Sequence, residues 1–142
     1  MRTHDGNNRA NNWRFDADTE TTEHFRRFSA IHDLLAPELM ALAEEAQSTS
    51  APIVRHLALQ YPEDRETWDV HDQFLLGPDL LVAPVVREGL VEREVYFPEG
   101  TWFDVWTGEA IDGGQRLSVA APIGRPPVFH RDTDRTDIRR VP

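Results

Sequence analysis

The stretch LLVAPVV, residues 80–86, decides the fold class of this chain. It is a short, continuous apolar run, and runs of this length that contain several valines are typical of strands buried in a core. From Asp72 onward the sequence has the texture of a β domain, because short apolar segments recur with Pro and Gly turns between them. We therefore place a β domain around this stretch.

Alternating apolar and polar residues continue the β pattern after this stretch. Trp102, Asp104 and Trp106 share one face of a predicted strand, and turns are expected at Pro98–Gly100 and Gly113–Gly114. Short strands at roughly 8–12-residue spacing with such turns indicate an antiparallel sandwich. The predicted strands cover residues 91–97, 101–107, 117–121 and 127–129, so we expect a small antiparallel β-sandwich domain over residues 71–131.

A long helical pattern precedes the β domain, from about Thr19 to Gln47. Asp18 stands in the N-cap position, where its carboxylate can accept from free backbone N–H groups of the first turn. Pro37 interrupts the pattern, and it is tolerated either as the first residue of a second helix or as a kink. The apolar residues that recur at helical spacing include Phe25, Phe28, Ile31, Leu35, Leu39 and Leu42.

The segment Pro52–Pro62 is predicted to form one strand after this helix. A long helix followed by a strand is typical of an α/β unit, in which strands are buried on both faces. The chain is therefore expected to cross a domain boundary near residue 70. We predict an α/β part over residues 1–70, the β domain over residues 71–131 and a flexible, Arg/Asp-rich tail over residues 132–142.

The composition excludes several classes of function. The 142 residues carry a net charge of −10, which argues against nucleic acid as a partner. All 15 basic residues are arginine, so the chain has no lysine for Schiff-base chemistry or for a phosphate loop. Cysteine is absent, which excludes disulfides and thiolate metal sites. No apolar run approaches the roughly 18 residues of a membrane span, and we expect no membrane partner and a cytoplasmic location.

The densest polar cluster is the run Arg2–Asn7, RTHDGN. Its histidine and arginine offer the paired donors and acceptors that sugar hydroxyls need, but an ordinary polar loop has the same composition. The other histidines lack the spacing of metal ligands, so we expect no metal site and no cofactor. Arg55 lies within an apolar strand pattern, and we expect it to form a structural ion pair because a buried arginine needs a carboxylate partner.

The aromatic residues Trp102, Phe103 and Trp106 allow two interpretations. They could form a platform on which a sugar stacks, or they could fill the core of the sandwich. Acidic neighbours such as Glu63 and Asp64 form no distinctive pair, whereas glycoside hydrolysis with retention needs two carboxylates roughly 5 Å apart. We therefore predict no catalytic residue in this chain.

Several motifs of the chain, in order, resemble glycoside hydrolase family 31. The most specific is Asp72–Val85, which is similar to the start of the family's proximal C-terminal β domain. Residues 1–7 are similar to a late strand of the family's barrel, residues 25–46 to the long kinked helix after it, and residues 51–64 to the last barrel strand. The resemblance implies the end of a (β/α)8 barrel, with its last helix and strand, followed by a small antiparallel β-sandwich domain.

The resemblance also implies an activity and a site. Members are retaining α-glycosidases, in which one Asp attacks the anomeric carbon and a second Asp protonates the leaving oxygen. Both aspartates correspond to positions before Met1, so we expect an inactive fragment of a longer enzyme whose missing partner is the N-terminal part of the barrel. His4 matches the histidine that binds hydroxyls of the glycone, and Arg2 and Asp5 are expected to support it in substrate binding.

Within the family, Arg2–Asn7 and the ending Ala121–Phe129 look most like the sulfoquinovosidases, which hydrolyse α-linked sulfoquinovosides. An α-glucosidase or α-xylosidase fragment is the alternative. Two further hypotheses differ in class. One is a non-catalytic β module that binds carbohydrate through Trp102 and Trp106, and the other is a subunit that completes a barrel in trans.

Overall fold

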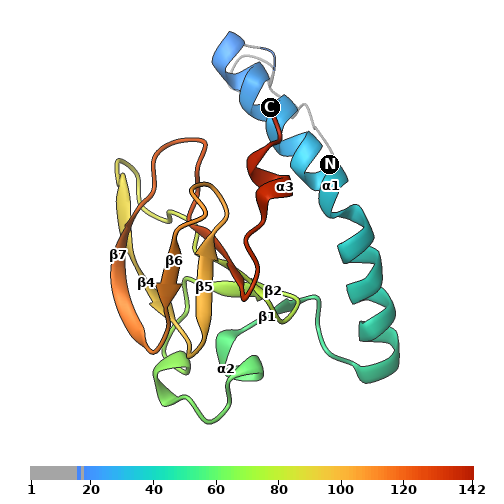
Figure 1. Ribbon diagram of the computed structural model, residues 1–142, viewed down its shortest axis with the longest axis vertical. Helices are drawn as coiled ribbons and strands as arrows, with labels where there is room; N and C mark the ends of the chain where they lie inside the picture. Colours follow the sequence, from blue (N-terminus) through green and yellow to red (C-terminus); the bar gives the residue numbers. More distant parts are fainter. Residues whose placement is uncertain (1–15, 17) are drawn as a thin grey trace, which may run out of the picture.

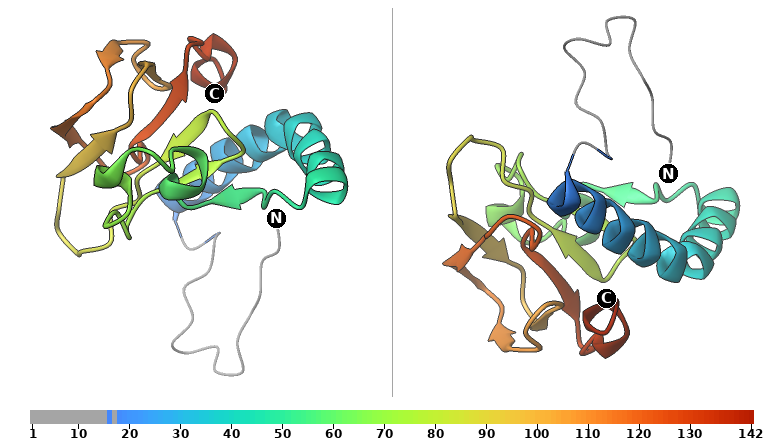
Figure 2. Two further views of the ribbon diagram at one scale, coloured as in Figure 1. Left: turned by 90° about the horizontal axis from the view of Figure 1, so that it is seen from below. Right: turned by 90° about the horizontal axis from the view of Figure 1, so that it is seen from above.

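The computed structural model describes Asp16 and residues 18–142. This part of the chain consists of one long helix beside a small antiparallel β domain (Figures 1 and 2). The antiparallel β domain confirms the prediction for the second half of the chain. The prediction that residues 1–70 form the end of a barrel stays a prediction, as does the domain boundary near residue 70.

The long helix is α1, Thr19–Thr49. Its predicted N-cap is confirmed, because a carboxylate oxygen of Asp18 accepts from the backbone N–H of Thr21 at 2.7 Å. Pro37 lies inside the helix, so one helix spans the segment rather than two. Ser50 ends it in the left-handed conformation, with φ of 65°, and donates its N–H to the carbonyl of Ala46 at 3.0 Å.

The prediction of one strand over residues 52–62 is wrong for most of that segment. Only β1, Val54–Arg55, is extended, and the short helix α2, Leu57–Gln60, follows it. The reason is local: Nδ1 of His56 accepts from the backbone N–H of Ala58 at 3.1 Å, which caps α2. A 3-10 turn, η1, Arg65–Thr67, then leads into the β domain.

Two antiparallel sheets make up the β domain. The larger sheet has the strand order β1-β2-β3-β8-β5-β6, and the smaller one pairs β4 with β7. The strands β2 and β6, with three residues each, differ from the strands predicted from the sequence pattern, which did not include them. The strand bounds are β2 Phe74–Leu76, β3 Leu80–Val82, β4 Glu92–Phe97, β5 Thr101–Asp104, β6 Ala110–Asp112, β7 Gln115–Ala120 and β8 Val128–Arg131.

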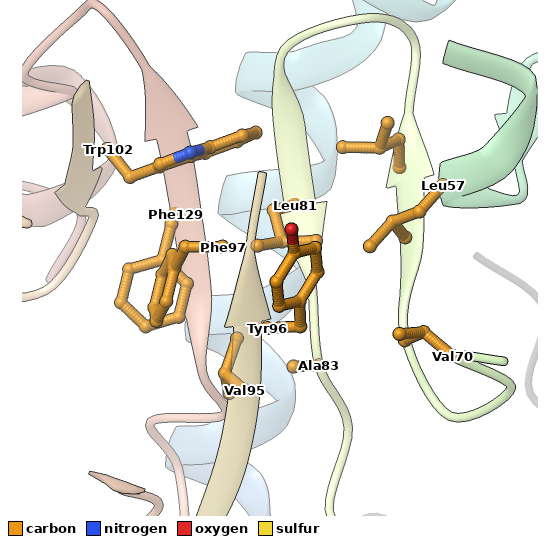
Figure 3. Packing of buried hydrophobic residues seen from close by; sticks show 10 residues of the cluster. Leu57, Val70, Leu81, Ala83, Val95, Tyr96, Phe97, Trp102 and Phe129 are labelled. Carbon is orange, nitrogen blue, oxygen red and sulfur yellow. The ribbon is translucent and has the colours of Figure 1, made fainter. Parts of the chain in front are cut away.

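The main core lies between the two sheets (Figure 3). Phe97 of β4 and Phe129 of β8 meet edge to face with ring centroids 4.7 Å apart. Trp102 of β5 is completely buried in the same cluster. Burying each large apolar side chain contributes about 1.5–3 kcal/mol relative to leaving it exposed, so this cluster is the main source of stability for the β domain.

A buried amide joins the two sheets at one edge. Nε2 of Gln73 donates to the carbonyl of Tyr96 at 3.0 Å, and the backbone N–H of Tyr96 donates to Oε1 of Gln73 at 2.9 Å. Gln73 immediately precedes β2, whereas Tyr96 belongs to β4. The side chain therefore satisfies a free backbone edge of the smaller sheet from the side of the larger one.

A second apolar cluster holds α1 against the β domain. Ile31 is its buried residue on α1, and Phe28 and Leu35 pack beside it. The indole of Trp106 meets the ring of Phe28 edge to face at 6.4 Å. These positions follow the helical spacing in the sequence, so only one stripe of α1 faces the β domain.

The expected flexible tail contains a packed element. The short helix α3, Thr136–Arg139, buries Ile138 in the second cluster. The guanidinium of Arg135 makes ion pairs with Asp137 at 2.8 Å and with Glu38 of α1 at 2.9 Å. The tail departs from the prediction because its partners lie on α1, far away in the sequence. In Figure 1, α3 lies between the β domain and the upper half of α1.

Gly113 and Gly114 form the turn between β6 and β7, and they differ in what restricts them. A Cβ on Gly113 would collide with the carbonyl oxygen of Pro98, whereas a Cβ on Gly114 would have only Glu99 nearby, at 3.8 Å. Gly114 has φ of 74°, so its restriction is conformational.

We predict that Gly113→Ala lowers the free energy of unfolding by about 3 kcal/mol or more, because the clash is with rigid backbone. The neighbouring control, Gly114→Ala, should cost only about 1–2 kcal/mol for the left-handed conformation. Urea unfolding followed by tryptophan fluorescence measures both. Equal losses for the two variants would contradict this account of the turn.

Candidate functional site

The predicted substrate-binding residues His4, Arg2 and Asp5 lie outside the described residues. Their role therefore stays a prediction. The structure shows the surroundings of the other residues that the sequence singled out. It also shows a groove that the sequence did not indicate.

Arg55 forms the predicted structural ion pair. Its Nη2 lies 2.8 Å from Oε2 of Glu45 on α1, and only 6% of the residue is exposed. The same guanidinium donates to the carbonyl of Pro52 at 2.8 Å and to Oε1 of Gln60 at 3.2 Å. Its donors are therefore used to fasten the C-terminal end of α1 to β1, and the residue is not available to a ligand.

The histidines of the described part do not gather into a metal site. His56 and His71 are near each other, with ring centroids 6.1 Å apart. No group of three or more His, Cys, Asp or Glu side chains among the described residues could hold a metal ion.

Trp102 and Trp106 pack in the apolar clusters rather than forming an open platform. Trp102 is fully buried, and its Nε1 donates to the carbonyl of Pro98 at 2.8 Å. Trp106 is half-buried, and its Nε1 donates to the carbonyl of Pro126 at 2.6 Å. The guanidinium of Arg27 lies 5.0 Å from the Trp106 ring centroid. Trp102 therefore has no exposed ring face to offer a sugar.

The structure adds a groove between the α2–η1 segment and the smaller sheet. Its volume is about 680 Å³, and Tyr61, Asp64, Tyr96 and Glu99 are among its lining residues. The combination of tyrosine rings with carboxylates suits hydroxyl-rich ligands. Two of these side chains are already hydrogen-bonded to each other, since the hydroxyl of Tyr96 donates to Oδ2 of Asp64 at 2.6 Å.

This Tyr96–Asp64 contact escapes prediction from the sequence. Tyr96 alternates with Val95 and Phe97, which predicts an outward-facing side chain, yet only 5% of it is exposed because residues of α2 and η1 cover it. Burial, and then the hydrogen bond to Asp64, raise the pKa of the Tyr96 hydroxyl. The other carboxylate oxygen of Asp64 accepts from the N–H of Glu66 at 3.1 Å and caps η1.

The sequence profile of the glycosyl hydrolase family 31 C-terminal domain matches residues 50–133. The chain belongs to glycosyl hydrolase family 31. This confirms the family that the motifs indicated. The match covers the whole β domain together with β1, α2 and η1.

Relatives within family 31 include two sulfoquinovosidases. The one from Escherichia coli is 45% identical over 92% of this chain, and the one from Agrobacterium fabrum is 42% identical over 92%. The chain spans about a fifth of the length of these curated relatives, 19% and 20%. "Alpha-glucosidase 2" of Bacillus thermoamyloliquefaciens is 41% identical over 66% of this chain and 12% of its own length.

Solved structures of family 31 enzymes share the fold. A sulfoquinovosidase from E. rectale, in complex with an aza-sugar inhibitor, aligns with a TM-score of 0.91 and 34% identity over 98% of this chain and 21% of its own. An α-xylosidase from a soil metagenome aligns with a TM-score of 0.81 and 33% identity, over 86% of this chain and 18% of its own.

Among the described residues, no helix combines the length and the apolar character of a membrane-spanning segment.

We predict that Tyr96→Phe lowers the free energy of unfolding by about 1.5–3 kcal/mol, because it leaves the Asp64 carboxylate without its buried donor. Tyr61→Phe is the matched control. The Tyr61 hydroxyl accepts only a long hydrogen bond from Arg131, 3.4 Å, and its loss should cost less than about 0.5 kcal/mol. Chemical denaturation of both variants measures the difference, and similar losses would contradict the assignment.

The same contact predicts a dependence on pH. The pKa of Tyr96 is raised by folding, so its contribution to stability is complete below the ordinary tyrosine pKa of about 10 and is lost as the pH rises above it. The free energy of unfolding of the wild-type chain should therefore fall more steeply above pH about 10 than that of Tyr96→Phe. Parallel curves for the two proteins would refute the link.

Proposed function

We propose that this chain is the C-terminal portion of a retaining α-glycosidase that hydrolyses α-linked sulfoquinovosides. The observation that carries the proposal is the likeness to sulfoquinovosidases, at 45% identity over 92% of the chain and with a TM-score of 0.91 to a solved one. This identity extends over nearly the whole chain, so it includes residues outside the segment 50–133 that matches the family's C-terminal domain.

In this proposal residues 1–70 end the catalytic barrel and residues 71–131 form the β domain that braces it. The helix α1 has apolar side chains for a second neighbour, since Met40 is 64% exposed and Leu34 is 37% exposed. Arg55 and Arg135 fix α1 to the β domain, and this fixes the outer face of α1 for packing against the rest of the barrel.

The substrate would be bound by His4, with Arg2 and Asp5 in support. The nucleophilic and acid/base aspartates would come from the preceding part of the enzyme, so the proposed chain does not hydrolyse glycosides alone. A cytoplasmic location remains part of the proposal, to be tested by cell fractionation.

A neutral-sugar glycosidase is the second candidate. It is favoured by the 41% identity to an α-glucosidase and by the alignment with an α-xylosidase. The two candidates differ in the glycone, so the decisive comparison is kcat/KM of the complete enzyme on nitrophenyl α-sulfoquinovoside, α-glucoside and α-xyloside. The first substrate should be preferred by at least about 100-fold, and a preference for either neutral sugar would replace the proposal with the second candidate.

We predict that His4→Ala in the complete enzyme lowers kcat/KM by about 100-fold or more without changing the thermal unfolding midpoint. His32→Ala, a substitution at an exposed histidine of α1, is the matched control and should leave the kinetics unchanged. Unaltered kinetics in His4→Ala would remove His4 from the site.

The isolated 142-residue chain should show no hydrolysis of any of the three nitrophenyl substrates. Turnover by the pure chain, retained after repeated purification, would show that it holds catalytic carboxylates of its own.

A further inference from the structure

We infer that an apolar groove between two loops of the β domain docks the part of the enzyme that precedes α1. The groove lies between residues 84–90, after β3, and residues 121–126, after β7, and has a volume of about 590 Å³. We call it the loop groove. The inference rests on the proposed function, because it requires that this chain belongs to a longer glycosidase.

The loop groove exposes large apolar side chains that the fold does not use. Ile123 is 86% exposed, Val86 is 64% exposed and Leu90 is 45% exposed. Val91, at the edge of the groove, is 66% exposed. Exposed aliphatic residues are ordinary when they are scattered, but several on two facing loops form a patch of the kind that packs against another protein surface.

Both loops are held in place by contacts at their bases. Arg93 is buried, and its Nη1 donates to the carbonyl of Pro84 at 2.5 Å while its Nη2 pairs with Asp72 at 2.9 Å. On the other side, the N–H of Ala121 donates to the carbonyl of Val91 at 2.7 Å. The bases of both loops are therefore fixed before a partner arrives, which reduces the entropy lost on docking.

The position of the loop groove indicates its occupant. A Cβ on Gly124 would collide with the imidazole of His24, so the second loop touches the first turns of α1. Figures 1 and 2 place this loop and the start of α1 at the same end of the molecule. The helix α1 therefore begins beside the groove. Relatives in family 31 are longer than this chain, which spans 19% of one of them.

Charge at the rim favours the same occupant over a second copy of this chain. Arg87 and Glu88 line the groove, and Arg125 is exposed on its second loop. Among the ion pairs of the described residues, none involves Arg87 or Arg125. The chain carries a net charge of −10, so two copies repel each other. The surface fits a partner with apolar side chains at its centre and carboxylates around them.

Thiol labelling tests this docking because the chain has no cysteine of its own. Ile123→Cys and Val86→Cys place reporters in the loop groove, and Ser118→Cys, at an exposed position of β7, is the control. Each variant is reacted with a maleimide, once as this chain alone and once within the complete enzyme. Mass spectrometry of the labelled peptide gives the rate at the reporter position.

The groove reporters should react quickly in the chain alone and at least about tenfold more slowly in the complete enzyme, whereas Ser118→Cys should react equally fast in both. Equal labelling rates for Ile123→Cys in the two proteins would overturn the inference. So would a slowing of Ser118→Cys in the complete enzyme as large as that of the groove reporters. Protection that appears in the chain alone as its concentration rises would assign the groove to a second copy instead. Hydrolysis is measured separately on wild-type enzyme, so a failed docking result and a failed glycosidase assignment are distinguishable.

Discussion

The two sheets of the β domain depend on the pair of hydrogen bonds between Gln73 and the backbone of Tyr96. The smaller sheet has only two strands, and a two-stranded ribbon is marginal without further support. The Gln73 amide replaces a missing neighbouring strand at one residue, and the apolar cluster around Phe97 and Phe129 then closes the space between the sheets. One side chain thus ties the two sheets together beside the core.

The long helix connects this β domain with the part of the chain in which substrate contacts are proposed. Two arginines of the β-domain side hold it, Arg55 through Glu45 and Arg135 through Glu38. Both guanidinium groups are buried. Losing Glu45 would leave Arg55 without a carboxylate partner, whereas Arg135 would keep its ion pair with Asp137. Any shift of α1 relative to the β domain would disturb both pairs, which favours a fixed orientation.

Most of the fold follows from sequence patterns, and the departures have identifiable causes. The Asp18 cap, the alternating strands and the Arg55 ion pair follow from local rules. The segment 52–62 departs because one side chain, His56, caps a helix where hydropathy predicts a strand. Tyr96 is buried by residues of α2 and η1, which are distant from it in the sequence. Local hydropathy patterns do not predict such contacts. The candidate site at His4 rests on resemblance and could not be derived from residue spacing.

The contact between Arg135 and Glu38 joins residues 97 positions apart, and it has a consequence for synthesis on the ribosome. The helix leaves the ribosome before the α3 segment, which packs with Ile31 in the second cluster. During translation α1 can therefore adopt helical structure but cannot bury its apolar stripe completely. Packing of α3 therefore completes this cluster, and until α3 leaves the exit tunnel the nascent chain presents part of an apolar helix face to chaperones.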